Sequence, residues 1–411
     1  MKISLTPCLK QPELRLWMLA QFASLVGRWI ECMGVLWLVY RLTNQTSSLG
    51  VVTLLVQGPA LVLASYAGWL VDKVDCRRIL LVTQSTFILL ALALVTMTVL
   101  HWVSVPLLMG AALLHGCAFP IDMVARRLYL RRVLADPSLL PSALGVHSFS
   151  TSGSKLLGPA LAALLMTKLG PLACFAAGFL CYVPALVASR LLPVRAATLP
   201  AQSSGLLTAV RYVRGHPVIS HAMGLSALAN FLLMPYTALF VAYVAQAFRA
   251  GESLAGTLVS TGAVGGLLAA FLLGPLSRKW APLPRAVATY AIMALCVAGV
   301  SISAHIWISA ALVFIAGLAM QIGLVSLSVV IQTEPAPDLR GKVSGLSLSI
   351  DIGMTSLGSL TLAEFAQATQ VKTAFATSAL LFLAFLTVGC LRHLRTSYRG
   401  TTSVPQEPEA A

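Results

Sequence analysis

The sequence predicts an all-α membrane protein in which twelve transmembrane helices form two six-helix repeats. Three observations favour this fold class. Of the 411 residues, 58% are hydrophobic and only 10% are charged, whereas a soluble domain carries about 25% charged residues. The apolar residues gather in runs of roughly 20, the length that a helix needs to cross the hydrocarbon core of a bilayer. Glycine and polar positions of the first half also recur in the second half.

The apolar runs divide into six and six around a break that contains proline, serine and arginine. They cover about residues 14–42, 48–71, 79–101, 103–124, 140–167, 170–192, 218–247, 253–276, 284–304, 306–331, 342–368 and 371–391. We therefore predict an N-terminal bundle over 1–192, a cytoplasmic linker over 193–217, a C-terminal bundle over 218–392 and a disordered cytoplasmic tail over 393–411. The tail prediction rests on its polar composition.

The positions of the Lys and Arg residues predict the orientation. Four lie in loops on one side, namely Arg41, Lys168, Arg249 and Lys372, and Arg28 and Lys155 lie within spans. The remaining 22 of the 28 Lys and Arg residues lie on the opposite side. The positive-inside rule assigns that side to the cytoplasm. The net charge of +15 is thereby explained without nucleic acid. We expect a multi-pass protein of the bacterial inner membrane with both termini in the cytoplasm and no cleaved signal.

The two halves show an internal repeat. Gly153 and Gly158 correspond to Gly353 and Gly358 at an offset of 200 residues. Parallel repeats of this kind place a substrate site near the membrane midplane, between the halves. Polar residues inside spans 5 and 11 are therefore candidates for that site.

The loop between the second and third spans carries the most specific motif. Its residues Gly68, Asp72, Lys73, Arg77 and Arg78 resemble the loop between helices 2 and 3 of the major facilitator superfamily. The resemblance implies the major facilitator fold and a cytoplasmic gate at this loop. Asp72 would then accept hydrogen bonds from the first turn of span 11, where the helix dipole favours a negative charge. The alternative is that these charges only set the topology.

Four further segments resemble one branch of that superfamily, the enterobactin-exporter and macrolide-efflux proteins. They are residues 122–127, 157–162, 211–217 and 338–343. The first resembles the branch's Asp-x-Pro-Ala-Arg-Gln signature, with Val124 in place of the proline. The resemblance implies export of a drug or siderophore, and it places Asp122, Arg126 and Arg127 in the cytoplasmic gate.

Ionisable residues inside spans are informative because each costs at least about 2.5–3.5 kcal/mol to insert. Glu31 lies near the middle of span 1, and Arg28 lies one turn earlier on the same helix face. We expect Glu31 to couple transport to protons and Arg28 to contribute to substrate binding. The alternative is a static pair, either of Arg28 with Glu31 or of Lys155 with Glu31.

Span 5 carries a polar stripe, because His147, Thr151 and Lys155 follow one another at intervals of four residues. A stripe of this kind is expected on the wall of a wet cavity. Lys155 is the candidate for binding an anionic substrate group, with packing as the alternative for His147. Asp351 is the repeat equivalent of Thr151 and the second candidate for proton coupling.

Asn230 and Gln57 are lesser candidates for substrate binding, since hydrogen bonds between helices would explain them equally well. The eight cysteines have no metal-ligand spacing, and no nucleotide-binding loop occurs, so we expect no metal, cofactor or enzymatic activity. The prediction is a monomeric secondary exporter that exchanges protons for an amphipathic small molecule, a siderophore or a drug. Alternatives are a lipid or lysophospholipid transporter, an importer, or a membrane sensor or scaffold without transport.

Overall fold

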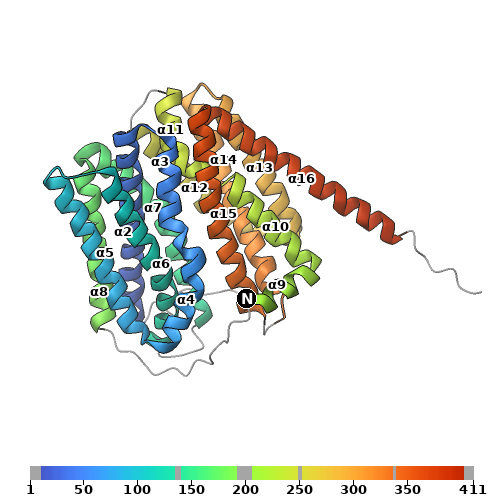
Figure 1. Ribbon diagram of the computed structural model, residues 1–411. Coiled ribbons are helices and arrows are strands. Elements are labelled where there is room, and N and C mark those ends of the chain that lie inside the picture. Colours follow the sequence, from blue (N-terminus) through green and yellow to red (C-terminus); the bar gives the residue numbers. More distant parts are fainter. Residues whose placement is uncertain (1–10, 135–139, 192–205, 249–251, 337–338, 402–411) are drawn as a thin grey trace, which may run out of the picture.

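The computed structural model describes residues 11–134, 140–191, 206–248, 252–336 and 339–401, and the regular structure in these ranges is helical. Figure 1 shows two groups of helices side by side, joined by a connection whose residues are outside the described ranges. The first group holds α2 (Pro12–Thr43), α3 (Thr46–Gln57), α4 (Pro59–Lys73), α5 (Cys76–Val99), α6 (Val105–Val133), α7 (Leu140–Leu169) and α8 (Pro171–Leu191).

The second group begins with a short helix and then repeats the pattern. It holds α9 (Leu206–Gly215), α10 (Pro217–Leu232), α11 (Tyr236–Phe248), α12 (Glu252–Lys279), α13 (Pro282–Ile302), α14 (Ile306–Thr333), α15 (Arg340–Ala368) and α16 (Val371–Thr401).

The predicted membrane fold of twelve helices is confirmed. Ten helical segments of the described part are long and apolar enough to cross a membrane, and α12, bent by 44°, makes eleven. The twelfth position belongs to α7, which is 30 residues long. Two spans are each built from two helices, α3 with α4 and α10 with α11. The first break lies at Pro59, which lacks the amide hydrogen that would continue the ladder of helix α3.

The structure adds a helix to the predicted linker, and it differs from the prediction in the tail. The linker contains α9, whose Val213 packs with Ile219 of α10 and Val343 of α15. Helix α16 continues to Thr401, where a disordered tail was predicted, and Figure 1 shows this end extending away from both bundles. Residues 193–205 and 402–411 lie outside the described residues.

The two bundles meet through α15 against α3 and α4, and through α7 against α12. The contacts are tight at the ends that the charge pattern assigns to the outside. A Cβ atom on Gly50 would lie 2.6 Å from Ala363 Cβ, and one on Gly256 would overlap Ala163. The backbone N–H and the hydroxyl of Thr46 also donate to Gln367 Oε1 at 2.7 and 2.9 Å. The outer ends are therefore closely packed.

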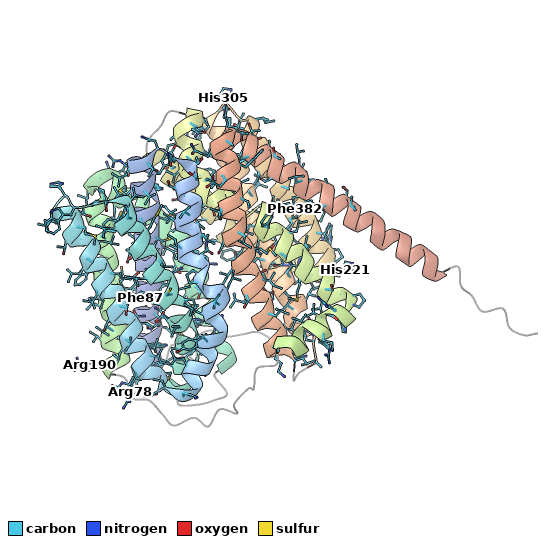
Figure 2. All side chains as sticks on the ribbon, viewed as in Figure 1. Arg78, Phe87, Arg190, His221, His305 and Phe382 are labelled. Atoms are coloured by element: carbon cyan, nitrogen blue, oxygen red, sulfur yellow. The ribbon has the colours of Figure 1, made fainter. Side chains whose placement is uncertain are left out.

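The inner ends of the same helices are less tightly packed. A Cβ atom on Gly274 of α12 or on Gly345 of α15 would meet no heavy atom within 4 Å. Figure 2 places Arg78 and Arg190 together at this end and His305 at the opposite end. At these glycines the outer ends are therefore more closely packed than the inner ends.

Candidate functional site

A buried carboxylate–imidazole pair lies inside the N-terminal bundle. Glu31 Oε1 of α2 is 3.4 Å from His115 Nδ1 of α6, and both side chains are buried. The His115 ring stacks on Phe87 of α5, with 4.7 Å between centroids. Phe87, labelled midway between the ends of the bundle in Figure 2, also packs on Tyr182 of α8 at 5.4 Å. Four helices thus enclose one carboxylate and one imidazole.

This pair has hydrogen-bonding capacity that the described residues do not use. Glu31 Oε2 and His115 Nε2 are buried and make no hydrogen bond of ordinary geometry. Tyr182 is close enough to interact electrostatically with Glu31. A cavity of about 10 Å³ adjoins the pair and is lined by Glu31, Cys32, Val35, Val56, Ala111, Ala112 and His115. This volume is close to the ~10–15 Å³ that one water molecule needs.

Arg28 does not pair with Glu31, so the expected static pair between them is wrong for the described side chains. Its guanidinium carbon lies 3.4 Å from the ring centroid of Phe119 on α6. A guanidinium over an aromatic face gains electrostatic attraction without a carboxylate. Arg28 Nε is buried and has no hydrogen-bond partner among the described residues. The alternative pair of Lys155 with Glu31 is also not found among the described side chains, where the group within 4 Å of the Glu31 carboxylate is His115.

A buried ion pair lies closer to the end of the bundle that carries Arg78 and Arg190. Arg126 Nε pairs with Asp122 Oδ2 one turn apart on α6. Asp122 Oδ1 accepts hydrogen bonds from Thr83 Oγ1 at 2.8 Å and Gln84 Nε2 at 2.7 Å, both on α5. Arg126 Nη2 donates to Ser24 Oγ of α2 at 2.9 Å. All these partners belong to the N-terminal bundle, so this network holds three of its helices together, and its gate role stays a prediction.

The other predicted gate residues are at the same end. Lys73 and Arg78 are exposed, as is Arg127 on α6. The Arg77 guanidinium donates to the backbone oxygen of Arg190, which joins α5 to the end of α8. Gly68 and the Asp72 side chain lie outside what the structure describes, so the predicted contact of Asp72 with span 11 stays a prediction.

The C-terminal bundle places Asp351 of α15 in a neutral hydrogen-bonded cluster. Its Oδ1 accepts from Ser226 Oγ at 2.6 Å and from Asn230 Nδ2 at 3.1 Å, both on α10. Thr355 Oγ1 donates to Asn230 Oδ1 at 2.9 Å. Asp351 is half-buried. The sequence candidates Asp351 and Asn230 therefore form one site.

Lys155 connects the two bundles electrostatically. It is exposed on α7 of the N-terminal bundle and interacts with Asp351 of the C-terminal bundle and with Arg28. Its neighbour one turn away, Thr151, donates to the His147 backbone oxygen at 2.9 Å, and His147 is buried. Of the three polar residues His147, Thr151 and Lys155 in span 5, Lys155 is thus the one whose charge acts on the C-terminal bundle.

Gln57, half-buried at the end of α3, makes no side-chain hydrogen bond in the described part of the chain. Four residues of these sites were not predicted from the sequence, namely His115, Tyr182, Ser226 and Thr355. His115 had a usable signal, because it is an ionisable residue inside a predicted span. Ser226 lies one helical turn before Asn230, but only the packing of α10 on α15 shows that both serve Asp351.

Comparison with known proteins agrees with this architecture. Residues 3–408 match the family described as transmembrane secretion effector. The chain belongs to this family of major facilitator transporters. It is also 24% identical over 345 residues to the Staphyloferrin A transporter of Staphylococcus aureus, which covers 83% of this chain and 86% of that protein.

Solved structures of several transporters share the fold. The nucleoside transporter NupG superposes with a TM-score of 0.73 at 12% identity, over 92% of this chain and 98% of that chain. A bacterial homologue of the lysosomal transporter Spinster gives 0.69 at 13% identity, over 94% and 96%. A bacterial homologue of the iron transporter ferroportin gives 0.67 at 15% identity, over 91% and 98%. These similarities concern the fold alone.

Proposed function

We propose that this transporter exports an amphipathic organic anion across the bacterial inner membrane in exchange for protons. The observation that carries the proposal is that Lys155 and Asp351, which belong to different bundles, lie close enough to interact electrostatically. The exposed lysine supplies a cation for a carboxylate or catecholate of the cargo. Asp351, on α15 of the other bundle, offsets part of the Lys155 charge when the cargo is absent.

A siderophore is the preferred cargo. The similarity to a protein named for the transport of Staphyloferrin A, together with the exposed cation Lys155, supports an anionic siderophore. A macrolide-type drug is the second candidate, supported by the branch resemblance of residues 122–127. Glu31 and Asp351 are the candidate groups for proton coupling, since each is a carboxylate within a span.

The two bundles pack closely at their outer ends and have open space beside Gly274 and Gly345 at their inner ends. This difference supports a rocking cycle. The outer contacts at Gly50 and Gly256 would open when the inner ends close. In that cycle the cargo binds from the cytoplasm near Lys155 and leaves to the outside, while protons return inward. A lipid transporter, an importer, or a sensor without transport activity would not show this directed exchange.

Transport into inverted membrane vesicles tests the proposal. Vesicles with the protein should accumulate a labelled catecholate siderophore, a labelled carboxylate siderophore or a labelled macrolide when the interior is acidic. Lys155→Gln should weaken uptake of the anionic cargoes, and Lys155→Arg should retain it. Flipping of a fluorescent lysophospholipid without uptake of these compounds would contradict the proposal and favour the lipid alternative.

A further inference from the structure

The embedded ionisable groups fall into two places with different surroundings. Lys155 and Asp351 lie between the bundles, exposed and half-buried respectively. Glu31 and His115 lie inside the N-terminal bundle, where only 3% and 6% of their surfaces are exposed. A cargo molecule can reach the first place. The second place has room for about one water molecule, so it suits a small ion such as a proton.

The charges around the Glu31–His115 pair suit a site that gains and loses one proton. With one shared proton, the pair has no net charge, and without it the pair carries one negative charge. Arg28, one turn away on α2, supplies the positive charge that offsets the deprotonated state. Arg28 itself has no ionic partner within 4 Å among the described side chains.

The other titratable or charged groups near the pair do not cancel this effect. Cys32 on α2 and Tyr182 on α8 interact with Glu31, while Lys155 on α7 and the Asp122–Arg126 pair on α6 interact with Arg28. The Asp122–Arg126 pair is neutral as a unit, and helix α5 contributes the uncharged ring of Phe87. Arg28 is therefore the cation on the same helix as Glu31 that can offset the deprotonated pair.

We infer that Glu31 and His115 together form the proton site of the transport cycle, separate from the cargo site at Lys155 and Asp351. Arrival of a proton from outside forms one O–H or N–H bond at the pair, and its release to the cytoplasm breaks that bond, with no electron transfer. Glu31 Oε2 and His115 Nε2, which make no hydrogen bond of ordinary geometry, are the atoms through which the proton passes, with Tyr182 interacting with Glu31 from α8. This inference rests on the proposed function. It assigns proton coupling to the Glu31–His115 pair instead of to the two carboxylates Glu31 and Asp351.

Proteoliposomes with the full-length protein separate coupling from cargo binding. We compare accumulation of a labelled siderophore driven by a pH gradient with its exchange at equal pH. Glu31→Gln and His115→Gln should each lower gradient-driven accumulation at least about tenfold, within the 5–150-fold range of coupling between sites, and should keep the exchange rate. The double variant should lose no more than either single one, because the residues act as a unit. His101→Gln, on an exposed outer loop, is the matched control.

A purely structural role would lower exchange and accumulation together, and that result overturns the inference. Normal gradient-driven accumulation in both single variants also overturns it. Infrared difference spectroscopy during acidification gives a readout without cargo. A carboxyl band that is lost in Glu31→Gln and shifted in His115→Gln supports the dyad, and an unchanged band in either overturns it. If the wild type moves no siderophore or macrolide while this band behaves as expected, the proposed function fails and the proton site stands.

Discussion

The two bundles hold their embedded carboxylates differently. In the N-terminal bundle the carboxylates of Glu31 and Asp122 are buried, and they face His115 and Arg126 of the same bundle. In the C-terminal bundle Asp351 is half-buried, and its hydrogen-bond partners are neutral. Paired and buried charges fix helices or bind protons, whereas a half-buried charge with neutral partners is available to the facing bundle and to a cargo.

The largest expected effect of a mutation concerns the Asp122–Arg126 pair. Arg126→Ala leaves the Asp122 carboxylate buried with only Thr83 and Gln84 as donors. Loss of one partner of a buried ion pair typically costs about 3–5 kcal/mol. We expect the free energy of unfolding in detergent to fall by about that amount, as measured by denaturant titration of the purified protein.

The matched control removes both charges together. Asp122→Leu combined with Arg126→Met leaves no lone charge, and such replacements are often neutral. In the C-terminal bundle, Ser326→Ala removes the hydroxyl that accepts from Arg285 Nε at 2.7 Å. Its change in unfolding free energy is compared with that of Arg126→Ala. If Arg126→Ala is no worse than the double variant, the pair does not fix the N-terminal bundle as described.

The next effect tests how the two bundles are joined. Gly256→Ala adds a Cβ where Ala163 already lies, while Gly274→Ala, on the same helix, adds one in open space. Overpacking costs about 1–3 kcal/mol, so Gly256→Ala should separate α7 from α12 at the outer end. Spin labels at Lys168 and Thr257 should report a longer distance in Gly256→Ala and an unchanged distance in Gly274→Ala. Equal distances in both variants would show that the outer seal does not depend on this contact.

The sequence predicts what depends on composition and periodicity. Long apolar runs are enough to place the spans, and the scarcity of embedded charge is enough to select Glu31, Lys155 and Asp351. The partners were not predictable, because they depend on how each helix is rotated against its neighbours. Arg28 shares a helix face with Glu31, yet its side chain packs on Phe119 of a different helix.

The helix within the linker was not predicted for a related reason. Residues 206–215 contain enough polar side chains to suggest a linker, but the amphipathic helix α9 buries Val213 against α10 and α15. A short helix of this kind gains most of its stability from tertiary packing, which a reading of composition does not include.

A smaller effect is expected in the C-terminal bundle. Ser226→Ala removes the shortest hydrogen bond to Asp351. Bonds to charged groups contribute about 1.5–3 kcal/mol, and the half-buried carboxylate places this one at the lower end. We expect a modest drop in unfolding free energy, measured by the same titration, and altered binding of anionic cargo. Ser349→Ala, whose hydroxyl donates to its own helix at Gly345, is the control. A loss as large as that of Arg126→Ala would contradict the contrast between the bundles.

The smallest effect lies where the two bundles touch through neutral groups. Thr46→Val removes the hydroxyl that donates to Gln367 Oε1, but the Thr46 backbone N–H keeps its 2.7 Å bond to the same oxygen. A net loss of about 0.5 kcal/mol, the lower end for a neutral hydrogen bond, is expected. This loss should appear as a slightly larger fraction of outward-open molecules in spin-label distance measurements. The control is Thr361→Val, whose hydroxyl bonds only within α15, and it should leave that fraction unchanged. A shift as large as that of Gly256→Ala would mean that hydrogen bonding, and not close packing, holds the bundles together outside.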